Sequence, residues 1–163
     1  IHILNGGLKK WIFENKPITK LTTEIIDSNY VANEKENLVV SFDQIKKNIL
    51  SKSFNVIDAR SLERFEGKVS EPRKGLRSGH IQNSFCLPFN QCINQKTGEF
   101  KNLEELRELF NQNENIEKRL DQVFTCGSGV TAAVLAYAYK MVNNDYIPKI
   151  YDGSWSEYGK YPA

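Results

Sequence analysis

Hydrophobic residues along the chain gather in short continuous runs, which are separated by polar segments that contain glycine or proline. The runs Phe54–Asp58, Ser84–Phe89, Gln122–Thr125 and Pro148–Tyr151 have the length of strands rather than of helices. A strand that is covered on both faces shows such a run in place of an alternating pattern. The runs therefore predict a largely parallel central sheet that is buried between other elements.

Two helices are predicted from the spacing of a capping box, in which a serine or asparagine is followed one turn later by Gln or Glu. The first box begins at Ser41 and opens a helix that we expect to continue through Ile49. The second begins at Asn102. Its helix would place three leucines on one face, at Leu103, Leu106 and Leu109.

Two further helices complete the alternation of strands and helices. A short one is predicted at Ser61–Glu66, and a longer one, apolar on all sides, at Thr131–Val142. Strands that alternate with helices are typical of an α/β fold in which helices cover both faces of the sheet.

Two corners of the chain, Leu4–Trp11 and Tyr151–Tyr158, share one pattern. Each has an apolar residue, Asn or Asp, Gly, a small residue and, after three variable positions, an aromatic residue. The pattern is either common turn chemistry or the trace of a duplicated domain. We expect the duplication, with residues 1–11 as the tail of a preceding, absent domain, 12–37 as an interdomain linker and 38–163 as the domain proper. The chain does not begin with Met, so we expect a fragment of a longer protein.

Composition and charge exclude several classes of function. The 163 residues include 22 Lys and Arg against 20 Asp and Glu, a balance that gives no general reason to bind nucleic acid or anionic lipid. The longest uncharged run, Gln122–Tyr139, is too polar at its centre for a membrane span. Three cysteines without a CxxC pair indicate neither a disulfide framework nor a zinc site. We therefore expect no metal and no cofactor, and a reducing compartment, cytoplasmic or mitochondrial.

Candidate chemistry lies where the strand ending at Thr125 meets the helix beginning at Thr131. The connecting residues Cys126–Val130 include two glycines, which let backbone N–H groups turn inward, and the positive end of the helix dipole points at the loop. A thiol there ionises more readily than a free one, and the thiolate is a nucleophile. The alternative role for a free cysteine is that of a small, buried hydrophobic residue. We favour a reactive thiol for Cys126 and a buried hydrophobic role for Cys86. Nothing in the sequence around Cys92 indicates a reactive thiol.

The charges around this loop exclude one class of cysteine enzyme. A cysteine phosphatase needs an arginine that closes the loop over the phosphate, at the position that Ala132 occupies here, and no Lys or Arg lies between Cys126 and Lys140. Cationic side chains must come from elsewhere. Arg64 and Arg73, near the loop 67–79, are candidates because arginine binds a carboxylate through two parallel hydrogen bonds.

No chemical role is predicted for the other polar side chains of this region. Lys68, Lys74 and Arg77 are expected to be solvated, with casual ion pairs to neighbouring glutamates. His80 is expected to be a buried, hydrogen-bonded turn residue. No His–Asp pair accompanies Cys126 in the sequence, so its general base is unaccounted for.

Several motifs resemble those of the rhodanese superfamily. Cys126–Thr131 resembles the active-site loop of its 3-mercaptopyruvate sulfurtransferases, and Tyr151–Tyr158 matches the C-terminal signature of the superfamily. Val56–Arg60 and Glu71–Gly75 resemble the matching stretches of the catalytic domain. Gly79–Ile81 matches a further signature, although the usual Pro-Gly-Ala after it is replaced by Gln-Asn-Ser.

The resemblance implies a rhodanese-like fold and a catalytic role for the domain at 38–163, with an inactive rhodanese-like domain before it. It implies that Cys126 takes sulfur from 3-mercaptopyruvate as a persulfide, releases pyruvate and passes the sulfur to a thiol such as that of thioredoxin. Arg64 and Arg73 would bind the substrate, and Ser128 would belong to a polar relay completed by an acid and a histidine of the N-terminal domain. The remaining loop residues implied for the site are Gly127, Gly129, Val130 and Thr131.

Two other functions stay open. One is a sulfurtransferase that prefers thiosulfate, although relatives of that kind carry basic residues where this chain has Gly127 and Ser128. The other is a non-catalytic rhodanese-like binding module, against which the intact cysteine and the arginine pair argue together.

Overall fold

The computed structural model describes residues 2–33, 37–112 and 116–162. Its sheet contains four parallel strands in the order β2-β1-β3-β4. Their bounds are β1 Phe54–Asp58, β2 Ser84–Cys86, β3 Asp121–Thr125 and β4 Lys149–Ile150. The four predicted strands and their parallel arrangement are confirmed, with shifted ends. β2 ends early because the chain turns at Pro88, which has no N–H for a sheet, into a short 3₁₀ helix.

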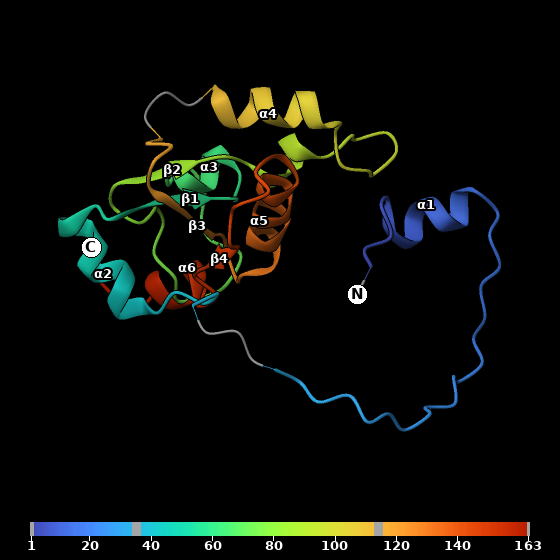
Figure 1. Ribbon diagram of the computed structural model, residues 1–163. Coiled ribbons are helices and arrows are strands. Elements are labelled where there is room, and N and C mark those ends of the chain that lie inside the picture. The colour runs from blue at the N-terminus through green and yellow to red at the C-terminus, as the bar shows by residue number, and fades with distance from the viewer. Residues whose placement is uncertain (1, 34–36, 113–115, 163) are drawn as a thin grey trace.

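Helices precede, separate and follow these strands along the sequence, and most of them lie around the sheet in space (Figure 1). Both predicted capping boxes are formed. The Ser41 hydroxyl accepts from the N–H of Gln44, and the Asn102 side chain accepts from the N–H of Glu105. In chain order the helices are α1 Gly7–Phe13, α2 Phe42–Ser51, α3 Leu62–Phe65, the 3₁₀ helix η1 Phe89–Cys92, α4 Leu103–Asn111, α5 Val130–Val142 and α6 Ser154–Tyr158.

Neighbouring residues of the central strands pack into two different hydrophobic cores. Val56 and Val123 pack with residues of α2 and α6, among them Trp155. Ile57 and Phe124, the next residues along each strand, pack with residues of α4 and α5. Successive side chains of a strand point to opposite faces, so helices cover both faces of the sheet, as expected. Figure 1 shows α4 and α5 on one side and α2 and α6 on the other.

One detail of the helix prediction is wrong. Leu103 is 42% exposed, whereas Leu106 is fully buried together with most of Phe110. Residues four apart lie on the same helix face, so the buried stripe of α4 runs through 106 and 110 rather than through Leu103. In α5 one side is buried, but Tyr137 is 40% exposed. None of the helices in the described part of the chain is long and apolar enough to cross a membrane.

The N-terminal segment contacts the domain at one place. The N–H of Phe100 donates to the side-chain oxygen of Asn5 (2.9 Å), and Lys10 pairs with Glu99. α1 itself buries none of its residues. The described residues after it, up to 33, form no helix or strand and are exposed.

Candidate active site

The candidate site lies at the carboxyl edge of the parallel sheet, where ligand sites of open α/β sheets are usually found. β1 and β3 end side by side there, with Asp58 paired to Thr125. The chain then passes through Cys126 and enters α5 after Gly129, whose φ of 82° lies in the left-handed region that glycine adopts freely. The predicted strand–loop–helix arrangement around the cysteine is therefore present.

The loop wraps its own N–H groups around the sulfur of Cys126. Cys126 is 2% exposed, and the N–H of Ser128 donates to its Sγ (3.4 Å). Burial by itself raises the pKa of this thiol. Hydrogen bonds from the Thr131 hydroxyl and from backbone N–H groups, including that of Ala132, outweigh burial and hold the pKa below the ordinary thiol value. The cysteine predicted as nucleophile thus lies in a site that stabilises its thiolate.

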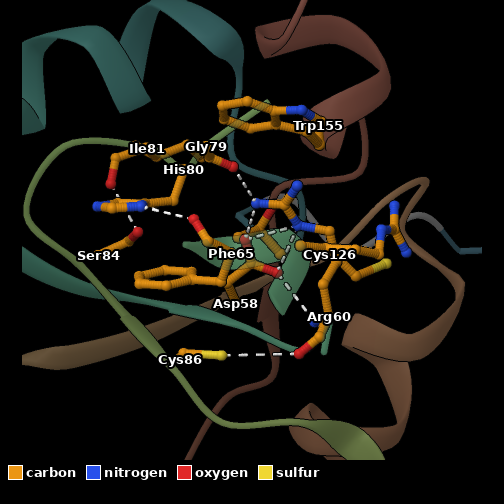
Figure 2. Close-up of polar contacts among 12 residues, drawn as sticks. Asp58, Arg60, Phe65, Gly79, His80, Ile81, Ser84, Cys86, Cys126 and Trp155 are labelled. Carbon is orange, nitrogen blue, oxygen red and sulfur yellow. Dashed lines mark hydrogen bonds and ion pairs between the residues drawn. The ribbon is translucent and has the colours of Figure 1, made fainter. Parts of the chain in front are cut away.

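The other two cysteines lie in the opposite kind of environment. Burial raises the pKa of Cys92 to about 12, and the same cause, helped by the Asp58 carboxylate, raises that of Cys86 to about 12. Cys92 is completely buried. Cys86 is only partly buried, contrary to the expectation of a buried residue. It is the last residue of β2, and its thiol donates to the carbonyl oxygen of Arg60 (3.6 Å; Figure 2).

This difference predicts selective alkylation. At neutral pH, iodoacetamide should modify Cys126 far faster than Cys86 or Cys92, because only Cys126 has a lowered pKa. Thr131→Val removes the hydroxyl donor and should slow modification of Cys126 about tenfold at pH 7, with the pH profile moved upward. Peptide mass spectrometry of timed samples measures both effects. The exposed Thr23→Val serves as control, and equal rates at all three cysteines would contradict the prediction.

The first turn of α6 holds the loop from behind. The hydroxyl of Ser154, completely buried, accepts from the N–H groups of Cys126 (3.1 Å) and Gly129 (3.0 Å) and donates to the carbonyl of Tyr151 (2.8 Å). The N–H of Trp155 in turn donates to the Cys126 carbonyl (2.9 Å). Sequence reasoning placed Ser154 in a signature but gave it no role. Its small size after Asp-Gly was the available signal.

Arg64 and Arg73 both lie beside the loop. A Cβ atom built on Gly127 would be 3.1 Å from Nη2 of Arg64 and 3.5 Å from Nη1 of Arg73. A side chain at position 127 would therefore press on the guanidinium groups, so glycine at this position lets both arginines approach the loop. The structure brings together the predicted nucleophile and the predicted carboxylate ligands, whose roles stay predictions.

Arg64 is tied to a buried network that the sequence did not reveal. Glu71 was expected in a casual surface ion pair, but its side chain is 1% exposed. It accepts from Arg64 (Nη2–Oε2, 2.6 Å) and from Arg60 (Nη1–Oε1, 2.9 Å), and Arg60 pairs in turn with Asp58 (2.7 Å). The Arg60 guanidinium also lies over the ring of Trp155, 4.5 Å from its centroid (Figure 2). The network fixes the position of Arg64 next to Gly127.

Two assignments near this network are wrong. Arg77 was expected to be solvated, but its guanidinium stacks on the ring of Trp155 (4.6 Å to the centroid), and its carbonyl accepts from Nε1 of that ring. His80 was expected to be buried and is exposed, because its ring stacks on the outside of Phe65 (4.0 Å between centroids). It is hydrogen-bonded, as expected, through Nδ1 to the Phe65 carbonyl oxygen (2.8 Å).

Three more of the residues singled out in the sequence are exposed. Lys68 and Lys74 are exposed, as expected. Val130 is 72% exposed at the start of α5. Ser128 gives the sulfur its N–H, while the relay role of its hydroxyl, which the resemblance completes with residues of a preceding domain, stays a prediction. Within the same ranges, no group of three His, Cys, Asp or Glu side chains could hold a metal ion.

Fold and site together define a parallel α/β domain with a cysteine-containing loop at the carboxyl edge of its sheet. The family described as the rhodanese-like domain matches residues 41–161, and the chain belongs to that family. The chain is 35% identical over 158 residues to 3-mercaptopyruvate sulfurtransferase of Homo sapiens, covering 97% of this chain and 52% of that protein. It is 34% identical to thiosulfate sulfurtransferase of Gallus gallus, covering 97% and 53%.

Two further comparisons agree with this family assignment. Thiosulfate/3-mercaptopyruvate sulfurtransferase 1, mitochondrial, of Arabidopsis thaliana is 42% identical over 183 residues, covering 99% of this chain and 48% of that one. The crystal structure of SseA from Escherichia coli, described as a 3-mercaptopyruvate sulfotransferase with the rhodanese fold, superposes with a TM-score of 0.76 at 29% identity, over 94% and 55% of the two chains. The family resemblance and the fold class are confirmed. The chain spans about half the length of the curated relatives it matches.

Proposed function

We propose that this chain is the catalytic half of a sulfurtransferase, in which Cys126 carries sulfur from 3-mercaptopyruvate to an acceptor thiol. The observation that carries the proposal is the lowered pKa of Cys126 in a loop that has the guanidinium groups of Arg64 and Arg73 beside it. A thiolate nucleophile and two guanidinium groups able to bind a carboxylate thus lie at the same loop. Relatives named for both donors support the reaction class.

The proposed reaction has two steps. The Cys126 thiolate attacks the sulfur of 3-mercaptopyruvate, an S–S bond forms, and the C–S bond breaks with its electron pair going to carbon. The resulting enolate takes a proton and leaves as pyruvate, while the outer sulfur keeps the thiol hydrogen as Cys126–S–SH. An acceptor thiol, such as that of thioredoxin, then takes this sulfur as its own persulfide and returns its hydrogen to Cys126.

The side chains around the loop favour this donor over thiosulfate. The carboxylate and keto oxygens of 3-mercaptopyruvate can be held by Arg64 and Arg73 while its sulfur reaches Cys126. The loop N–H groups that stabilise the thiolate would also stabilise the persulfide. Gly127 and Ser128 add no cation beside the sulfur, as the dianion thiosulfate would need. Ser128 is proposed as a proton relay near the cysteine.

The proposed domain organisation is the one expected from the repeat: 1–11 as the tail of a preceding rhodanese-like domain, 12–37 as linker and 38–163 as the catalytic domain. The two corners support it, since Gly7 (φ 59°) and Ser154 (φ 50°) take the same left-handed backbone at matching positions. The N–H of Lys10 bonds to the Gly6 carbonyl as that of Glu157 bonds to Gly153. The preceding domain would complete the relay, so this chain should load sulfur but turn over slowly. We place the reaction in a reducing compartment, the cytoplasm or mitochondrion.

Intact mass after incubation with a sulfur donor tests the proposal. We expect the chain to gain one sulfur atom from 3-mercaptopyruvate and the Cys126→Ala variant to gain none. Cys86→Ala is the matched control and should still load. A gain from thiosulfate alone would favour the thiosulfate enzyme. No gain from either donor, in folded protein joined to its preceding domain, would favour a non-catalytic module.

A further inference from the structure

A buried carboxylate lies directly behind the proposed donor-binding arginine. Both oxygens of Glu71 accept hydrogen bonds from guanidinium groups, Oε2 from Arg64 and Oε1 from Arg64 and Arg60. These bonds use Nε and Nη2 of Arg64 and leave its Nη1 without a hydrogen-bond partner in the described part of the chain. Arg64 thus presents one edge to Glu71, while its Nη1 and Nη2 lie 3.8 and 3.1 Å from the position of a Cβ on Gly127.

The charges of this cluster nearly cancel. Arg60 is neutralised by Asp58 through a buried ion pair, and Arg64 by Glu71. Arg73 makes no ion pair within the described residues and is exposed. Three guanidinium groups and two carboxylates leave one net positive charge beside Cys126. The carboxylate of Asp152 lies against Gly129 and brings one further negative charge to the loop, but it is exposed and therefore screened by solvent.

We propose that Glu71 determines donor selectivity. Its negative charge favours binding of a donor with a single negative charge over binding of a dianion such as thiosulfate. The inference rests on the proposed function and deepens it. A pocket charge acts twice as strongly on a dianion as on a monoanion at the same place, and a buried charge is poorly screened by salt. Glu71 therefore weakens binding of thiosulfate more than binding of 3-mercaptopyruvate.

The test compares rates of persulfide formation with the two donors, followed by intact mass in a single turnover. In Glu71→Gln, the rate with thiosulfate relative to 3-mercaptopyruvate should rise about tenfold, and added salt should change that gain little because the charge is buried. Glu71→Asp keeps the charge, so it should keep the wild-type ratio even where both rates fall. Glu63→Gln removes an exposed carboxylate of α3 and should leave both rates unchanged.

The outcomes separate the two claims. An unchanged ratio in folded Glu71→Gln, or the same rise in Glu71→Asp, would overturn the role of the Glu71 charge while the proposed function stands. A wild-type chain that takes sulfur from neither donor would remove the proposed function itself. If Glu71→Gln does not fold, the wild-type protein still decides: pyruvate should protect Cys126 from alkylation at lower concentration than sulfate, and better protection by sulfate would overturn the inference.

Discussion

Arg73→Ala is expected to slow sulfur uptake from 3-mercaptopyruvate about a hundredfold and to leave the melting temperature unchanged. Arg73 is exposed and has no ion pair in the described ranges, so its removal disturbs no internal contact. Its Nη1 nevertheless lies 3.5 Å from the position of a Cβ on Gly127, beside the space proposed for the donor. Hydrogen bonds to a charged group contribute about 1.5–3 kcal/mol, which corresponds to a loss of about tenfold to a hundredfold, and a bidentate pair lies at the upper end.

Two companion variants make this prediction specific. Lys74→Ala removes an exposed cation from the next position and should change the rate little. Arg64→Ala should slow the reaction as well, but it also takes one of two partners from the buried Glu71 carboxylate, so the free energy of unfolding should fall by about 1–3 kcal/mol. Single-turnover rates and thermal melts separate binding from stability. Equal rates in Arg73→Ala and Lys74→Ala would exclude Arg73 from the donor site.

The parts of this structure that follow from local sequence could be predicted well. The strand at 54–58 is an apolar run, and the capping boxes at Ser41 and Asn102 depend only on residues within one turn. The reactive loop is local too, because Cys126, its glycines and the helix N-terminus adjoin one another in the chain. The ends of the strands were predicted less accurately, because Pro88 ends β2 before the end of the apolar run.

The parts that depend on distant contacts could not be predicted in this way. Glu71 is buried because Arg60, two residues after β1, and Arg64 both pair with it, and nothing in a charged loop shows which carboxylate will be enclosed. Arg77 packs on Trp155, a residue at the far end of the chain. His80 is exposed because its ring stacks on the ring of Phe65 and does not enter the core. Burial of polar side chains is decided by tertiary partners, which sequence spacing does not name.

Ser154 is the position where we expect one hydroxyl to affect both stability and reactivity. Ser154→Ala leaves the buried N–H groups of Cys126 and Gly129 without their acceptor. Each unsatisfied buried donor costs about 1–3 kcal/mol, so with two of them the free energy of unfolding should fall by about 2–6 kcal/mol. The loop that surrounds the thiol would also loosen, and a displacement of about 1 Å at a reacting group can slow a reaction about a hundredfold. Thermal melts and persulfide formation measure the two effects.

Ser154→Gly separates the hydroxyl from the backbone. Ser154 has a φ of 50°, which costs a residue with a side chain roughly 1–2 kcal/mol and glycine almost nothing, and Gly7 occupies the matching position of the first corner at 59°. The glycine variant should therefore be more stable than the alanine variant yet load sulfur as slowly. Ser156→Ala, which removes a hydroxyl bonded to the Gly153 carbonyl one turn away, is the control and should load normally. Wild-type loading by Ser154→Gly would show that the backbone of this corner, rather than its hydroxyl, holds Cys126 in place.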